Sequence, residues 1–121
     1  MRLVIHISVL PKPIRIELIL NGKATEIAMA NKSAAGMYYL SNKDHNGYPS
    51  WIREDKQMAI WMSNSSLKWM VGLYSSLGSN KRVIEGPEEK MEYPTQISSG
   101  WRCFVGNSSN ITEPAEIIIR G

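Results

Sequence analysis

The strongest constraint on this fold is a succession of short apolar alternations separated by turn residues. Apolar side chains occupy every second position in runs such as 14–20 and 57–62, which is the period of a strand with one buried face. Further strand-like runs lie at 3–9, 37–40, 51–53, 67–72, 82–84, 101–105 and 116–120. Short runs separated by turn signals at intervals of about ten residues are typical of all-β domains.

Helix is expected to be a minor component. No window carries the apolar spacing of a three-turn amphipathic helix, and the best candidate is a single turn over 88–92, after Pro87. We therefore predict an all-β fold, either a compact antiparallel sandwich or a partly open barrel of short strands. A chain of 121 residues has the length of one domain, so 1–121 is predicted to be a single β domain.

Aromatic residues are distributed unevenly within this predicted domain. All ten lie between positions 38 and 104, whereas the first 37 residues carry only aliphatic and methionine side chains in their apolar positions. Each part alone is small for independent folding. We expect an aliphatic region, 1–35, to pack on an aromatic-rich module, 36–121.

The aliphatic region contains a strong local hairpin signal. Asn21-Gly22 follows the alternating run 14–20, and this dipeptide readily supplies the positive φ angles of a type I′ turn. Folding about that turn would set Leu18 opposite Thr25 and Ile16 opposite Ile27. The same register would place two like charges, Glu17 and Glu26, opposite each other, which costs a few tenths of a kcal/mol unless that face is solvated.

Charge and composition argue against several partners. The formal net charge is only +3, and the densest basic pair, Lys81-Arg82, is followed directly by glutamates, so no nucleic-acid partner is expected. The apolar runs are far shorter than a membrane span requires, so no membrane partner is expected either. A single cysteine, Cys103, excludes an intrachain disulfide and is predicted to be a small buried hydrophobic residue.

The expected location is cytoplasmic. The apolar stretch after Met1 is interrupted by His6 and Ser8 and is followed by prolines instead of a small-residue cleavage site, which disfavours a signal peptide. Four Asn-x-Ser/Thr triplets begin at Asn31, Asn64, Asn107 and Asn110. These triplets fit the N-glycosylation pattern and would favour a secreted protein. However, a chain this rich in asparagine and serine contains such triplets by chance, so the cytoplasmic expectation stands.

No pattern indicates a catalytic centre, a metal site or a cofactor. His6 falls on a predicted strand, and His45 in a polar loop, where it is expected to be a satisfied loop histidine. Two histidines and one cysteine offer no zinc-ligand spacing. A cluster of glutamates at 85, 88, 89 and 92 is expected to be a solvated loop; the weaker alternative is a hydrolase that uses Glu88 or Glu92 with Asp44.

A second set of motifs covers about three-fifths of the chain, from 36 to 105. In order they are Gly36-Met37-Tyr38, Asn46-Gly47-Tyr48-Pro49-Ser50-Trp51, Ile60-Trp61, Trp69-Met70-Val71-Gly72, Leu77-Gly78-Ser79, Pro94 and Gly100-Trp101-Arg102. This pattern resembles a small tryptophan-rich β module of multidomain proteins in unicellular eukaryotes. The resemblance implies a noncatalytic unit joined to other domains. Tyr48 stands where such modules often carry a basic residue.

The aromatic residues of this module are expected to form the core, with exposed binding platforms as the alternative. Trp61 and Trp69 are predicted to lie on neighbouring strands in contact with each other. Tyr38, Tyr48 and Trp51, near the Asn46-Gly47 turn, are the candidate binding residues. We predict a noncatalytic binding module that contacts a protein partner as an interaction or scaffold domain; the alternative is binding of a carbohydrate or small ligand through exposed aromatics.

Overall fold

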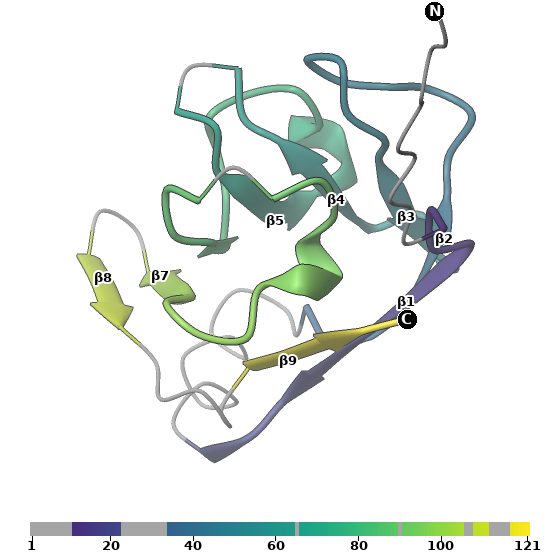
Figure 1. The fold of residues 1–121 in the computed structure, drawn as a ribbon. Helices are drawn as coiled ribbons and strands as arrows, with labels where there is room; N and C mark the ends of the chain where they lie inside the picture. The colour runs from purple at the N-terminus through teal and green to yellow at the C-terminus, as the bar shows by residue number, and fades with distance from the viewer. Residues whose placement is uncertain (1–10, 23–33, 65, 90, 106–107, 112–116) are drawn as a thin grey trace, which may run out of the picture.

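The computed structural model describes residues 11–22, 34–64, 66–89, 91–105, 108–111 and 117–121. These residues form one antiparallel sheet of nine strands that curls into a half-barrel (Figure 1). The prediction of an all-β fold is confirmed, and of the two architectures left open the partly open barrel is the one observed. Its strands are β1 (Arg15–Leu20), β2 (Gly36–Leu40), β3 (Trp51–Arg53), β4 (Met58–Met62), β5 (Trp69–Leu73), β6 (Ile84–Glu85), β7 (Arg102–Val105), β8 (Ser108–Ile111) and β9 (Ile117–Arg120).

The strands are connected as a meander with one return. Each strand from β1 to β7 pairs with the next one along the chain, and β9 then crosses back to pair with β1. Figure 1 shows β9 running beside β1 on the side opposite to β2. Strands β8 and β9 therefore form the two edges of the described sheet.

Most predicted strands are confirmed to within about two residues at each end, the usual uncertainty of strand limits. β8 was not predicted, because Ser-Ser-Asn-Ile lacks an apolar alternation. The predicted helical turn at 88–92 is wrong for its described residues, which are not helical. Short 3-10 turns occur instead at η1 (Tyr74–Ser76) and η2 (Pro94–Gln96).

The partner of β1 differs from the predicted hairpin. Residues 3–9 and 23–33 lie outside the described part, but both neighbours of Leu18 are described: Gly36 in β2 and Ile119 in β9. The predicted pairing of Leu18 with Thr25 is therefore wrong. Glu17 lies opposite Arg120 in place of a second glutamate, and their side chains form an ion pair at 3.0 Å.

The inner face of the half-barrel carries the main core. One row of directly opposed residues crosses the sheet through Leu40, Trp51, Ile60, Val71, Ile84 and Cys103. Strand β1 adds Ile16 and Leu18, and the segment around η2 adds Tyr93, Ile97 and Trp101. Cys103 is buried in this cluster, as predicted.

A smaller outer cluster lies on the other face of the same strands. It consists of Ala59, Trp61 and Met70, with Ile52 and Leu77 packed against it. Because side chains alternate along a strand, Trp61 of β4 lies on the face opposite to Met62, and Met62 is the residue paired with Trp69. The predicted contact between Trp61 and Trp69 is therefore wrong, although the two residues do lie on neighbouring strands.

Candidate binding surface on the outer face

The predicted binding residues lie mostly in the main core. Tyr38 and Trp51 have no exposed surface, and Tyr48 is half-buried. The rings of Tyr48 and Trp51 both meet Trp69, at centroid distances of 5.7 and 5.8 Å, whereas the Tyr38 hydroxyl donates a hydrogen bond to the Ala34 carbonyl oxygen. In this conformation Tyr38 and Trp51 offer no surface to a partner.

The polar atoms of the buried aromatic rings are hydrogen-bonded within the protein. The four tryptophans are at most 1% exposed, and each indole N–H donates to a backbone carbonyl oxygen, on Pro13, Ser79, Met91 or Ile97. Burial raises the pKa of the Tyr38 hydroxyl well above its ordinary value, and the nearby Arg53 guanidinium opposes that shift. These groups are satisfied parts of the core.

Exposed aromatic rings occur on the outer face instead. Tyr39 in β2 is 41% exposed, and Tyr74 in η1 is 38% exposed. Sequence reasoning missed both, although strand alternation carried a signal for one of them: if Tyr38 points inward, then Tyr39 must point outward. Tyr74 had no such signal, because it follows the end of a strand.

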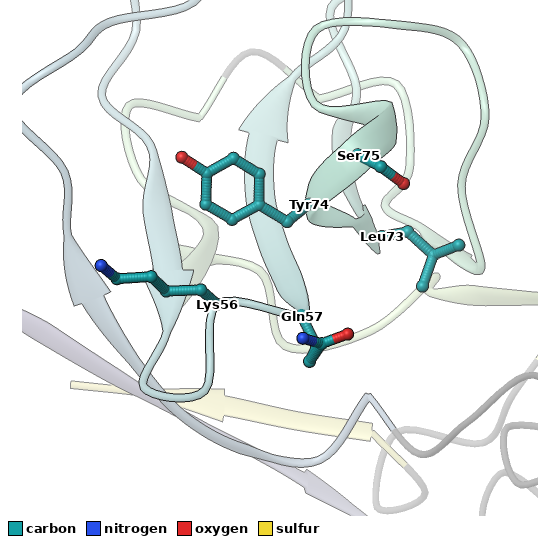
Figure 2. Close-up of a pocket in the computed structure, with 5 residues that line it drawn as sticks. All are labelled: Lys56, Gln57, Leu73, Tyr74 and Ser75. Atoms are coloured by element: carbon teal, nitrogen blue, oxygen red, sulfur yellow. The ribbon is translucent and has the colours of Figure 1, made fainter.

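Three adjoining hollows surround these two tyrosines. The Lys56 hollow, about 530 Å³, is lined by Lys56, Gln57, Leu73, Tyr74 and Ser75 (Figure 2). The His45 hollow, about 420 Å³, shares Tyr74 and Ser75 with it. The Tyr39 hollow shares Lys56 with the first and Ile52 with the second. We call the Lys56 and His45 hollows together the outer groove.

The loop 74–82 builds one wall of the outer groove and is fixed by backbone hydrogen bonds. Tyr74 N–H donates to the Gln57 carbonyl oxygen at 2.9 Å, and Leu77 N–H donates to that of Tyr74 at 3.0 Å. The Asn64 amide donates to the Gly78 carbonyl oxygen at 2.7 Å. The loop therefore covers the outer cluster in a defined conformation.

The turn between β3 and β4 positions Lys56 on the opposite side. Lys56 has a φ of 59°, and its N–H donates to the Arg53 carbonyl oxygen at 2.8 Å. The Arg53 guanidinium holds the Asp55 carboxylate through two hydrogen bonds of 2.9 Å. These bonds hold the pKa of Asp55 below its ordinary value.

His45 lies in the tight turn that closes the other end of the groove. His45 and Tyr48 exchange two backbone hydrogen bonds of 2.8 and 3.0 Å around Asn46 and Gly47, whose φ angles of 55° and 79° fit a type I′ turn. The prediction of a satisfied loop histidine is wrong at one atom. His45 Nε2 is buried and has no hydrogen-bond partner among the described residues.

The predicted solvated glutamate loop is wrong at one residue, because Glu85 is buried whereas Glu88, Glu89 and Glu92 are exposed. Glu85 is 7% exposed. Its carboxylate oxygens lie 3.9 Å from Lys68 Nζ and 3.5 Å from Arg82 Nε. Glu88 lines a hollow together with Glu85, and that hollow is lined by neither Asp44 nor Glu92. In that hollow Glu88 is grouped with Glu85 and with two cations, Lys68 and Arg102, and not with Asp44.

Within the described ranges, no group of three or more His, Cys, Asp and Glu side chains is placed to hold a metal ion. None of the described helical turns has the length or apolar character to cross a bilayer. Comparisons with protein-family models, with curated proteins and with solved structures found no match.

Proposed function

We propose that this chain is a noncatalytic binding module that contacts a protein partner as an interaction or scaffold domain. The proposal is supported by one observation above all: Tyr39 and Tyr74, from different elements, border adjoining hollows on the same outer face. Aromatic side chains are enriched at protein interfaces because they bury a large area while their polar ends stay hydrated.

The apolar neighbours of these tyrosines favour a protein over a carbohydrate. Ile52, Leu73 and Leu77 line the hollows, and aliphatic side chains complement apolar side chains of a peptide better than the hydroxyl-rich surface of a sugar. A carbohydrate remains the second candidate because an exposed tyrosine ring also stacks on a sugar. The proposed cytoplasmic location and the proposed kinship with the tryptophan-rich module are consistent with a scaffold role.

Selection from a displayed peptide library on the folded chain tests the proposal. We expect enriched peptides to bind the wild-type chain and to lose binding to the Tyr39→Ala/Tyr74→Ala variant. Both side chains are partly exposed, so the variant is expected to keep the fold, which near-ultraviolet circular dichroism checks. A glycan array that yields groove-dependent sugar ligands, with no enriched peptide, would contradict a protein partner.

A further inference from the structure

The charges that line the outer groove have one sign. Lys56 is the sole charged residue of the Lys56 hollow, and Lys43 is accompanied by His45 in the His45 hollow. Neither hollow is lined by a carboxylate. A ligand that carries negative charge would therefore meet a lysine in each of the two hollows.

Lys43 and Lys56 lack the counter-charges that four other cations of the described residues have. Arg53, Lys68, Arg82 and Arg120 each form an ion pair, whereas Lys43 and Lys56 form none within the part of the chain that the structure describes. Asp55 follows Arg53 closely and is held by its guanidinium. Glu54 lines the Tyr39 hollow, outside the groove.

The backbone at Lys56 supplies a second, independent observation. Its φ of 59° lies in the left-handed region, where a residue with a Cβ is less stable than glycine. Glycine is the residue that such a turn position favours. A lysine held in this conformation at the rim of a hollow fits the general tendency of backbone strain to gather at binding sites.

The groove also offers apolar surface and neutral hydrogen-bond donors. In Figure 2 the Lys56 ammonium and the Tyr74 hydroxyl lie on the same side of the hollow, with the Lys56 stem and the Tyr74 ring between them and Leu73. A carboxylate can accept from the ammonium and the hydroxyl while a neighbouring apolar side chain packs on the ring.

The carboxylates just outside the groove favour one class of negatively charged ligand over another. Asp44 adjoins Lys43 in sequence, and Glu54 and Asp55 precede Lys56. A nucleic acid carries a phosphate at every nucleotide and would be repelled along this rim. A peptide can place isolated carboxylates opposite the two lysines and leave the rim uncontacted.

We propose that the outer groove binds an acidic peptide segment of a partner protein, with carboxylates opposite Lys43 and Lys56 and an apolar side chain against Tyr74. This inference rests on the proposed protein-interaction function. It adds that the partner segment is negatively charged and that Lys43 and Lys56 recognise this charge.

The test titrates three synthetic peptides into the isotopically labelled full chain and follows its backbone amide NMR signals. The acidic peptide repeats Glu-Leu-Glu, and its counterparts replace glutamate by glutamine or by lysine. We expect the acidic peptide to shift amides of Lys56, Gln57, Tyr74 and Ser75. The Lys43→Gln/Lys56→Gln variant should bind the acidic peptide about fivefold more weakly at low salt. Added salt should reduce the difference in affinity between the variant and the wild-type chain.

Lys12→Gln is the matched control, because Lys12 is an exposed lysine that lines neither hollow, and it should leave the affinity unchanged. Unshifted core amides verify that each variant is folded. Equal affinities of the acidic and glutamine peptides, both lost in Tyr74→Ala, would overturn the charge preference and leave the protein-interaction function standing. If no peptide shifts the groove amides, the acidic-peptide proposal is wrong, and the displayed-library selection decides the protein-interaction function separately.

Discussion

The main core and the outer cluster use the same strands but are built differently. The main core gathers three tryptophans, Trp51, Trp69 and Trp101, inside the curl of the sheet, where strands and the η2 segment surround them. The outer cluster holds Trp61 alone, under the irregular loop 74–82. Both bury their tryptophans completely, so burial by itself does not distinguish the two sides.

The difference lies in what covers each cluster and what remains beside it. All five residues of β4 are buried, three facing the main core and two facing the outer cluster. The loop that covers the outer cluster leaves the outer groove along its margin. One face of the sheet is therefore devoted to stability, and the other combines a small core with the candidate binding surface.

The largest expected effect comes from truncating the main core at Trp51. Trp51→Ala removes a fully buried ring that meets Trp69 and Tyr93. We expect the free energy of unfolding to fall by about 3–5 kcal/mol, measured by urea denaturation. Trp51→Phe, which keeps an aromatic ring, should lose less. A loss below about 1 kcal/mol would contradict a single main core centred on these rings.

The outer cluster is tested at Gly72, where there is no room for a side chain. A Cβ there would lie 2.8 Å from Cη2 of Trp61 and 2.9 Å from the Lys81 carbonyl oxygen. We expect Gly72→Ala to reduce stability by about 1–3 kcal/mol through overpacking. In a Trp61→Phe background the smaller ring should lower that cost. An unchanged urea midpoint for Gly72→Ala would mean that the loop 74–82 does not press on the sheet as observed.

Tyr38 makes the stability of the fold depend on pH in the alkaline range. Its pKa is raised by burial, so the folded chain keeps the hydroxyl protonated at a pH where the unfolded chain ionises it. The resulting stability is complete below about pH 10, the ordinary value for tyrosine, and is lost as the pH rises above it. Tyr38→Phe forfeits the hydrogen bond to Ala34, at a cost of about 1 kcal/mol at neutral pH.

Urea midpoints between about pH 8 and pH 11 measure this dependence across the tyrosine range. The wild-type midpoint should fall more steeply than that of Tyr38→Phe, so that their difference narrows as the pH rises. A difference that stays constant over this range would show that Tyr38 ionises equally easily in the folded chain.

The smallest expected effect lies at the groove itself. Lys56→Gly relieves the left-handed backbone conformation and should raise the free energy of unfolding by up to about 1 kcal/mol. Lys56→Ala removes the same ammonium but keeps the Cβ, so the difference between the two variants measures the strain. Equal stabilities would indicate that the Lys56 conformation is not strained.

The sequence allowed the strands and one turn to be predicted, but not their partners. The Asn46-Gly47 turn formed as expected, because both residues tolerate positive φ and the hairpin is local. Asn21-Gly22 carried the same signal, and Gly22 does have a φ of 56°. Yet β1 pairs with β2, beyond the predicted hairpin, and with β9, about a hundred residues along the chain, because burial of its apolar face across the whole sheet outweighs a local preference.

The candidate site was harder to predict than the fold. Aromatic residues near a turn indicated a neighbourhood that overlaps the proposed binding surface, but the orientation of adjacent residues was not fixed by composition. Tyr38 and Tyr39 are identical in type, and only the register of β2 between β1 and β3 decides which one is buried. The hollow beside Tyr74 depends on where the loop 74–82 folds back, for which the sequence carried no periodic signal.

By itself, then, the amino-acid order determined the conformations of short segments: where strands alternate, where a chain can reverse, and where helix is absent. These are local properties of φ, ψ and side-chain spacing, which neighbouring residues set directly. The tertiary structure alone decided which strand meets which, which face of β4 holds Trp61, and where the lysines remain unpaired. Those outcomes depend on burying apolar area between residues far apart along the chain, a free energy shared by the whole sheet.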